Sequence, residues 1–463
     1  MGSLTLDTMS EIFSGIKGVD YADLYMQSGV SHSIMYEDGR MDTLSSSVSD
    51  GLGVRIVRGD NTVYAHTMGT DASSIRMAIG EAQDMSGADI SSPGDECESP
   101  FVPVMSLPSL DTGFFHDLDT SLRGECKYLR QVTFRYRTSR KSLLIVRGDG
   151  SIARDERAYT TFAASVVLER DGELETGYEA RSFGRTSDDF WSVCGADGLL
   201  TAESIARRAL SRGLLMLDAI PCPAGAMMVL MDGTAGGTMI HEACGHGLEA
   251  DIVRKDFSTY RDMTGKTVAA PIVTIVDDAT LPDMYGSYRC DDEGTPAGRT
   301  VLVENGVLRR YMTDISSANL GGLPRTGNGR RESYQHIPLP RMSNTFITPG
   351  ESERGEMLEM MKDGIIVKKM GGGEVNPTSG DFVFHVSEGY LVKDGKIGSP
   401  VKGATLTGNG PKALWNIIAV GRELILDPGV CGKSGQGVPV TDGQPTLLIK
   451  NLTVGGSDAG NVS

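Results

Sequence analysis

The sequence predicts an α+β protein with an N-terminal α/β domain (residues 1–115), a middle linking region (116–225) and a β-rich C-terminal domain (226–463). Three observations lead to this prediction. A chain of 463 residues is long enough for two or three domains. Its 39% hydrophobic and 23% charged residues are typical of globular proteins. Helical and strand-like patterns mix in the first two parts, whereas strand-like runs dominate the third.

The N-terminal part begins with a predicted helix near residues 5–17, followed by strand-like runs separated by turn signals. Asp71 is a candidate N-cap for a helix over 72–85, because its carboxylate can accept a backbone N–H of the first turn. The serine- and proline-rich segment 91–110 predicts an exposed loop, so the first domain is expected to end there.

The middle part opens with a predicted helix over 116–132 and continues into β-rich sequence. The pair Asp171-Gly172 lies between two strand-like runs, a pattern typical of a β-hairpin. Thr201 can cap a second helix up to residue 217, whose apolar residues recur on one face. Nothing in this part indicates chemistry.

The C-terminal part alternates strand-like runs with turn-rich loops. Apart from the motif described below, helices are expected only near 352–363 and 411–419. This part also holds more than half of the 59 glycines, which make up about 13% of the chain against a usual value of about 7%. Because glycine has no Cβ, the excess indicates many places where the backbone turns sharply or approaches another group closely.

The charge and the cysteines restrict the function further. The chain has 44 Lys+Arg and 61 Asp+Glu, a net charge of −17, so nucleic-acid binding is not expected and neutral or basic peptides are repelled least. The sequence has neither a signal-peptide pattern nor a run of about 18 apolar residues, which predicts a cytoplasmic protein without membrane contact. Seven sparse cysteines do not form a disulfide framework, so reduced thiols are expected.

The strongest motif is H-E-x-x-x-H, formed by His241, Glu242 and His246 after a glycine-rich turn. Zinc peptidases of the H-E-x-x-H type place two histidines four residues apart on one helix face, while the glutamate orients water. Here the interval is five residues, so a regular α-helix would leave the two rings roughly 140° apart. A π-bulged or unwound turn at 243–247 would realign them, and the glycines of this segment ease such a turn. The sequence therefore predicts a metal site, and a capped helix end without metal is the alternative.

Two histidines leave a zinc site incomplete, because catalytic zinc usually has three protein ligands and one open position. The nearby candidates for the third ligand are Cys244, Glu249 and Asp251. A remote candidate is Cys431, in a glycine-flanked segment that predicts a loop, with Lys433 beside it to favour the thiolate. The residues alone do not decide between Cys431 and the acidic candidates.

Several segments occur together in an order that resembles the TldD/PmbA family, namely HEACGHGLEAD (241–251), DDEGTP (291–296), TGNGRRESY (326–334), RMSNTF (341–346) and CGKSGQ (431–436). The resemblance covers nearly the whole chain, and the H-E-x-x-x-H motif places it with the catalytic TldD-type metallopeptidase subunits. It implies a metal, zinc with iron left open, that is held by His241, His246 and Cys431. It also implies that Glu242 is the catalytic base.

The resemblance further implies a homodimer, or a heterodimer with a TldE/PmbA-type sister subunit, that cuts unfolded or flexible peptides inside a shared chamber. A peptide bound as an added strand would be held by main-chain hydrogen bonds. Gly236 and Gly237 are candidates for lining its path, and Arg331, Asn344 and His385 for holding a substrate carbonyl. Each of these residues also has a structural alternative, such as a tight turn, a buried hydrogen bond or a strand position.

Three other functions remain open at this point. A non-catalytic scaffold subunit would carry a structural metal, closed by a fourth protein ligand such as Asp251 or Cys244. Another metal-dependent amide hydrolase could use two histidines and a cysteine, and would differ in the peptide length it prefers. A modulator of DNA gyrase is suggested by an older description of the family, but the acidic charge and the lack of a basic stripe oppose contact with DNA.

Overall fold

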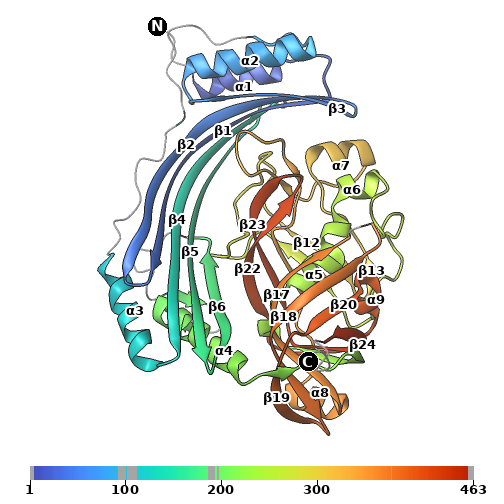
Figure 1. The fold of residues 1–463 in the computed structure, drawn as a ribbon. Coiled ribbons are helices and arrows are strands. Elements are labelled where there is room, and N and C mark those ends of the chain that lie inside the picture. Colours follow the sequence, from blue (N-terminus) through green and yellow to red (C-terminus); the bar gives the residue numbers. More distant parts are fainter. Residues whose placement is uncertain are drawn as a thin grey trace.

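The computed structural model describes residues 5–91, 101, 112–185, 193–195, 198–376 and 378–456. It has the predicted α+β fold, in which a long antiparallel sheet stands beside a β-rich C-terminal unit formed by residues 220–456 (Figure 1). The loop expected at 91–110 lies outside the described residues, apart from Ser91 and Phe101. Within the described part, no helix is both long and apolar enough to cross a membrane.

The long sheet has the strand order β3-β2-β1-β4-β5-β6, and every neighbouring pair is antiparallel. Its central pair, β1 with β4, joins residues from both sides of the division predicted at residue 115, and the division itself stays a proposal. The predicted hairpin is present, with Asp171 and Gly172 at positive φ between β5 and β6. The strands are β1 (Tyr21–Glu37), β2 (Arg40–Arg58), β3 (Asn61–Met68), β4 (Leu129–Arg147), β5 (Ile152–Arg170) and β6 (Glu173–Phe183).

Four helices accompany the long sheet: α1 (Leu6–Ser14), α2 (Ala72–Ser86), α3 (Gly113–Glu125) and α4 (Ala202–Leu217). The caps predicted for α2 and α4 are confirmed, because the side chains of Asp71 and Thr201 each accept a backbone N–H of the first turn. The helix expected over 116–132 begins and ends earlier, as α3. Its last predicted residues belong to β4, where Val132 and Phe134 alternate with less buried residues as a strand requires.

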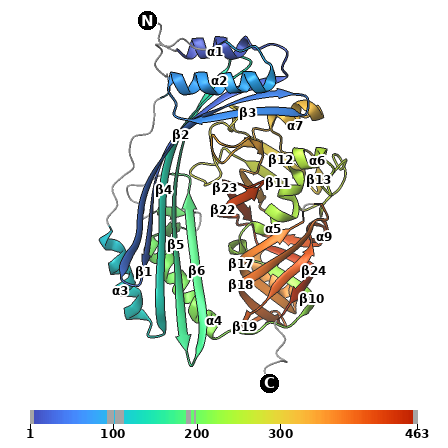
Figure 2. The same cartoon turned by 45° about the horizontal axis from the view of Figure 1, so that its top comes forward.

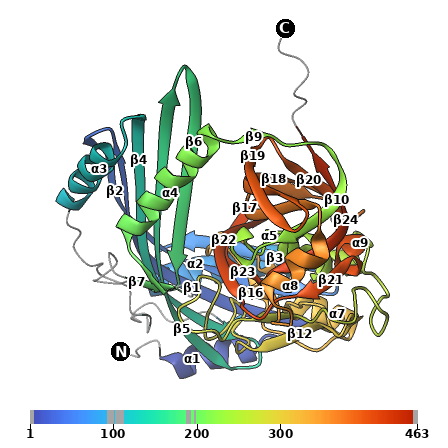
Figure 3. The ribbon, with the colours of Figure 1, turned by 90° about the horizontal axis from the view of Figure 1, so that it is seen from below.

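The two faces of the long sheet have different partners. Even-numbered residues of β1 and β4 pack against α1 and α2 at one end and against α3 and α4 at the other (Figure 2). Odd-numbered residues form what we call the inner face, which is turned toward the C-terminal unit (Figure 3). Tyr25, Leu143 and Ile145 of this face pack against Cys290 and Tyr334 of the C-terminal unit. The sheet and the unit therefore share a small apolar contact.

The C-terminal unit is built on two sheets. The larger contains β9 (Ile220–Pro221), β10 (Gly225–Met231), β17 (Gly364–Val375), β18 (Asp381–Lys393), β19 (Lys396–Lys402), β20 (Thr405–Asn409), β21 (Ile417–Val420) and β24 (Leu447–Gly455). The smaller contains β11 (Ile275–Asp278), β12 (Arg299–Glu304), β13 (Val307–Leu308), β16 (Asn344–Ile347), β22 (Ile425–Lys433) and β23 (Gln436–Gln444). Strands β22 and β23 form a hairpin at the edge of the smaller sheet, facing the long sheet (Figure 1).

The described chain also contains shorter elements. They are α5 (Thr238–Ile240), α6 (Ala250–Arg254), α7 (Ile315–Gly321), α8 (Arg354–Met361) and α9 (Gly410–Trp415), with the strand pairs β7 (Val193–Gly195) with β8 (Gly198–Leu200) and β14 (Gly329–Arg330) with β15 (Leu339–Pro340). Helices α8 and α9 lie where helices were expected. Helix α7 was not expected, although the reciprocal hydrogen bonds of Asp314 and Ser317 cap its first turn.

Candidate metal centre

The motif histidines lie on a short helical segment that follows β10 and α5. Residues His241–Gly245 form a π turn, in which the backbone N–H of His246 donates to the carbonyl of His241. The predicted widening is therefore confirmed, beginning two residues earlier than expected. It brings the two imidazole rings to a centroid separation of 4.8 Å at an interplanar angle of 84°. A five-residue interval thus places both histidines on one side of the segment.

The π turn is closely packed, and two glycines make this packing possible. A Cβ on Gly245 would lie less than 3.0 Å from Sδ of Met342. A Cβ on Gly410, at the start of α9, would lie less than 3.0 Å from backbone atoms of Ala243. Real Cβ atoms essentially never approach other atoms so closely, so a larger residue at Gly410 would have to displace the turn.

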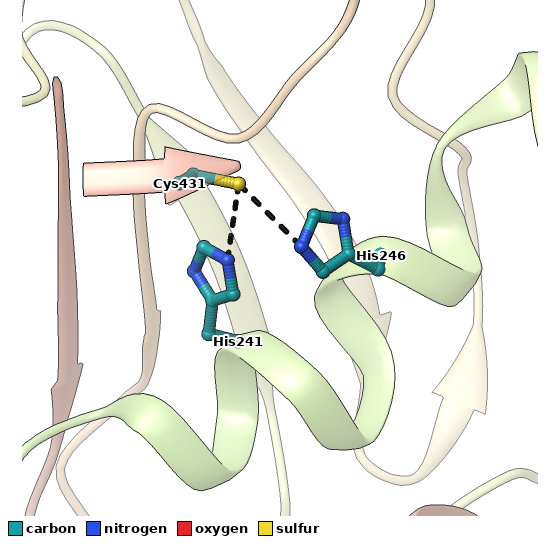
Figure 4. A group of neighbouring side chains, drawn as sticks. All are labelled: His241, His246 and Cys431. Atoms are coloured by element: carbon teal, nitrogen blue, oxygen red, sulfur yellow. Dashed lines mark hydrogen bonds between the residues drawn. The ribbon is translucent and has the colours of Figure 1, made fainter. Parts of the chain in front are cut away.

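Cys431 meets the two histidines from the β22–β23 hairpin. Its Sγ lies 3.2 Å from Nε2 of His241 and 3.5 Å from Nε2 of His246 (Figure 4). One donor atom from each of the three residues lies within 4.8 Å of the others. The segment expected to be a loop is strand β22, and a Cβ at Gly432 would meet nothing within 4 Å. Close backbone approach therefore does not explain that glycine.

Each histidine is oriented by a carboxylate on its other ring nitrogen. Nδ1 of His241 lies 2.9 Å from Oδ1 of Asp442, and Nδ1 of His246 lies 3.0 Å from Oε2 of Glu249. A proton held on Nδ1 by a carboxylate leaves the Nε2 lone pair free, which is the usual arrangement at metal-binding histidines. Lys433 does not face the sulfur of Cys431. Its Nζ lies 3.0 Å from Glu249 and 2.7 Å from Asp251, so it neutralises the outer carboxylates.

The electrostatics distinguish Cys431 from the nearby alternative, Cys244. Burial raises the pKa of Cys431, but His241 and His246 in their protonated form outweigh it through their charges and hydrogen bonds and lower that pKa to about 5. Burial alone raises the pKa of Cys244 to about 12, and its Sγ donates to the carbonyl of Ile240 at 3.4 Å. Only the thiolate is a good metal ligand. Two imidazoles and one thiolate are a donor set that zinc commonly takes in proteins, so the three residues fit a zinc ion.

Glu242 lies beside the cluster, as expected of a residue next to His241. Its side chain is half-buried, and burial raises the pKa of its carboxyl group, while the charges of His241 and His246 act in the opposite direction. A carboxylate whose pKa is shifted toward neutrality exchanges protons with water more readily at pH 7.

The sequence of the whole chain is similar to a known protein family and to named relatives. The family model described as the PmbA/TldA metallopeptidase C-terminal domain matches residues 224–456, and the models of domain 1 and the central domain match 22–86 and 108–217. The chain belongs to the PmbA/TldD metallopeptidase family. Three proteins named as metalloproteases are among those similar to this chain. A TldD homolog of Haemophilus influenzae is 38% identical over 98% of this chain and 97% of its own length. A metalloprotease of Methanocaldococcus jannaschii is 31% identical over 92% and 94%. A zinc metalloprotease TldD homolog of Saccharolobus solfataricus is 33% identical over 50% and 52%.

Two solved structures share the fold. TldE of Thermococcus kodakarensis matches with a TM-score of 0.74 at 16% identity, covering 97% of this chain and 98% of that one. A Thermotoga maritima protein described as a candidate modulator of a DNA gyrase matches with a TM-score of 0.75 at 21% identity, covering 97% of this chain and 100% of that one. At these identities the likeness shows the fold alone.

Two of the predicted substrate residues, Gly236 and Gly237, lie just before the PmbA/TldD motif helix. A Cβ at Gly236 would lie less than 3.0 Å from Oδ2 of Asp427, and a Cβ at Gly237 would lie equally close to the backbone of Gly443. Both contacts are with the β22–β23 hairpin. Packing of the chain on itself therefore accounts for these glycines, and their role in substrate binding stays a prediction.

The other predicted substrate residues make no hydrogen bond or ion pair with His241, His246 or Cys431. Arg331 is fully buried, stacks over Tyr25 at 4.3 Å and donates to the carbonyl of Asp292. The buried amide of Asn344 donates to the carbonyl of Asp278 and to Ser287. His385 is exposed on β18. Structural roles explain the first two, and substrate binding by all three remains a prediction.

Asp442 was not singled out from the sequence, although a signal for it exists. Cys431 pairs with Val438 across the hairpin, and strand alternation places Val438, Val440 and Asp442 on one face. An acidic residue on the same buried face as a candidate ligand is unusual and points to a partner such as an imidazole. This signal depends on recognising the hairpin, which was expected to be a loop.

Proposed function

We propose that this chain is a zinc peptidase of the PmbA/TldD family in which His241, His246 and Cys431 hold the metal and Glu242 is the general base. The observation that carries the proposal is the convergence of the three donor atoms within 4.8 Å of one another. Among the described residues, no fourth such donor belongs to this group, and Asp251 is occupied by Lys433. A site with three protein ligands has room for water and substrate, as catalytic zinc requires.

The proposed reaction divides between the metal and the chain. Bound zinc supplies Lewis acidity, which polarises the scissile carbonyl and acidifies water. Glu242 accepts a proton from the attacking water and returns it to the leaving amine. Asp442 and Glu249 keep the Nδ1 protons of the two histidines in place, so that each Nε2 lone pair points inward. The closed packing around the π turn fixes the distance between the two rings.

The substrates we propose are unfolded or flexible peptides, and the partner is a second copy of this chain or a TldE/PmbA-type sister subunit. Support comes from the family and from the fold shared with TldE. We also place the reaction in the cytoplasm. The cysteines of the described part with placed side chains, Cys126, Cys222, Cys244, Cys290 and Cys431, are free thiols, as a reducing compartment favours.

The test combines metal analysis with a peptidase assay on the purified chain, alone and with a sister subunit. We expect bound zinc, cleavage of flexible peptides, and slower cleavage of a native globular protein than of its unfolded form. Glu242→Gln should keep the metal and lose activity by at least about a hundredfold, because the carboxamide cannot accept the proton. Glu11→Gln, which changes an exposed carboxylate on α1, is the matched control. Wild-type activity in Glu242→Gln would overturn the assignment of the base.

A further inference from the structure

A cavity of about 400 Å³ lies between the inner face of the long sheet and the β22–β23 hairpin. Its floor comes mainly from odd-numbered residues of β1, β2, β4 and β5, and many of them are small hydroxyl residues such as Ser31, Ser47 and Ser139. Its other wall includes Val430 and Pro439 of the hairpin. Val430 precedes Cys431, so strand alternation directs its side chain away from the metal centre and toward the cavity. The two sites therefore lie on opposite faces of the same hairpin.

The cavity is rich in positive charge, unlike the chain as a whole. Arg137, Arg140 and Lys141 line it, and the one acidic residue in its lining is Glu332. The carboxylate of Glu332 already accepts the backbone N–H of Gly437 at 2.6 Å. An acidic overall charge had indicated that acidic peptides would be repelled. At this place the local charge has the opposite sign, so a carboxylate would be attracted.

Lys141 contributes an ammonium group without a counter-charge of its own. The carboxylates whose charges act on it are those of Asp155 and Asp292, and both are ion-paired with Arg157, at 2.8 and 2.9 Å. In the part of the chain with described side chains, Lys141 has no hydrogen bond or ion pair. Gly29 lies opposite it on β1, where a longer side chain would fill the space beside the ammonium stem.

Tyr159 gives a second, independent indication of a ligand. Its side chain is buried and lines the cavity, and its ring packs edge-on against Tyr285 at a centroid separation of 5.2 Å. Its hydroxyl has no hydrogen-bond partner among the described residues. Buried hydroxyl groups are normally paired, so this orphan donor points to a partner that the chain does not supply. The cavity thus offers an unpaired ammonium and an unpaired hydroxyl, both of which need an acceptor.

We propose that this cavity binds a carboxylate group of the peptide substrate, with Lys141 as the ion-pair partner and Tyr159 as a hydrogen-bond donor. The proposal rests on the proposed peptidase function and gives it a substrate class, peptides with an accessible carboxylate. That carboxylate is either the C-terminus or an Asp or Glu side chain. The serine-rich floor allows an extended backbone to lie along the inner face, because small side chains leave room for it.

Binding is measured by isothermal titration calorimetry on the full chain carrying Glu242→Gln, so that peptides are bound without being cut. Three decapeptides differ only in their carboxylates: one has two Glu residues and an amidated C-terminus, one has Gln residues and a free C-terminus, and one has Gln residues and an amidated C-terminus. We expect at least one carboxylate peptide to bind about tenfold more tightly than the neutral peptide. The peptide that does so identifies the source of the carboxylate.

Variants assign this preference to the cavity. Lys141→Met keeps the apolar stem and should abolish the preference, whereas Lys450→Met, an exposed lysine on β24, should leave it unchanged. Tyr159→Phe keeps the ring and should weaken carboxylate binding about threefold. Equal binding of all three peptides, or a preference that survives Lys141→Met, would overturn the proposal. If the wild-type chain cleaved all three peptides at equal rates, the proposed peptidase function would hold although the carboxylate preference failed. If carboxylate peptides bound and the wild-type chain cleaved none of them, the binding site would hold although the proposed peptidase function failed.

Discussion

His241 and Asp442 are 201 residues apart in the sequence, yet Nδ1 of the imidazole lies 2.9 Å from Oδ1 of the carboxylate. The contact joins the π turn to strand β23, whose neighbour β22 carries Cys431. One hairpin therefore supplies both a candidate ligand and the group that orients another ligand. His241 meets the hairpin through both ring nitrogens, Nδ1 at Asp442 and Nε2 at Cys431. The metal centre and the hairpin are therefore expected to be ordered together.

The first prediction concerns this orienting carboxylate. Asp442→Asn should lower zinc affinity about 10- to 100-fold, because the amide holds the Nδ1 proton of His241 less strongly than a carboxylate does. Competition with a zinc chelator measures the change. Asp171→Asn, in the exposed β5–β6 turn, is the control. Unchanged zinc affinity in Asp442→Asn would show that the carboxylate does not support the metal centre.

The second prediction concerns the thiolate. Cys431→Ser should remove most of the bound metal, because two imidazoles alone bind zinc too weakly to survive purification. Elemental analysis of the purified chain measures this directly. Cys222→Ser changes a buried thiol outside the cluster and should retain the metal. Full metal content in Cys431→Ser would rule out Cys431 as a ligand.

The third prediction concerns the packing behind the π turn. Gly410→Ala should destabilise the chain by about 1–3 kcal/mol and weaken metal binding, because the new Cβ meets the backbone of Ala243. Gly432→Ala, next to Cys431 but facing open space, should change neither property. Thermal unfolding with and without added zinc separates the two effects. A neutral Gly410→Ala would mean that the turn can move without cost.

The fourth prediction concerns the contact between the long sheet and the C-terminal unit. Arg55 is buried and paired with Asp23 of the same sheet and with Glu293 of the C-terminal unit, at 2.7 Å in the latter case. Arg55→Met should destabilise the chain by about 3–5 kcal/mol, since it removes the ion-pair partner of buried Glu293 and leaves Asp23 with only the more distant Arg331, at 3.7 Å. Arg130→Met removes an exposed pair with Glu169 and should cost less than about 1 kcal/mol. The midpoints of urea denaturation compare the two.

The fifth prediction is a pH dependence at the cavity. Burial, with the charge of Arg157 next in size, lowers the pKa of Lys141 to about 8, with Asp292, Arg330 and Asp155 as the other charged groups around it. The ammonium is charged below that pKa and neutral above it, so carboxylate preference should be present at pH 7 and decline toward pH 9.5. A bound carboxylate favours the charged form and moves the midpoint upward.

The matched variant for the pH experiment is Lys141→Arg. A guanidinium stays charged throughout this range, so its carboxylate preference should be the same at pH 7 and pH 9.5. Calorimetry at both pH values makes the comparison. If wild type and Lys141→Arg lose the preference in parallel, a group other than Lys141 controls binding.

How much of this could be predicted from sequence depends on the distance between the residues involved. The π turn followed from a local argument, because His241 and His246 are five residues apart and an α-helix cannot align them. Cys431 lies 190 residues from His241, and only the family resemblance singled it out from the acidic candidates. The pairing of β1 with β4 also joins residues far apart in the sequence, and periodicity carries no information about it.

Other differences have local causes. The segment around Cys431 is rich in glycine, which usually marks loops, but its alternation of buried Cys431 with exposed Val430 is that of a strand. Helix α7 spans only 7 residues, too few for helical periodicity to be visible. The buried positions of Arg331 and Asn344 follow from tertiary packing, since a polar side chain in a single sequence does not reveal whether its partners come from the protein or from a ligand.

The β22–β23 hairpin has a consequence for how the two sites communicate. It presents Cys431 to the histidines on one face and Val430 to the cavity on the other. Thermodynamic linkage is reciprocal, so any factor by which an occupied cavity changes metal affinity is also the factor by which the metal changes affinity for the cavity's ligand. Calorimetric titration of one ligand in the presence and absence of the other therefore measures the coupling free energy between the two sites. The value is the same whichever site is filled first.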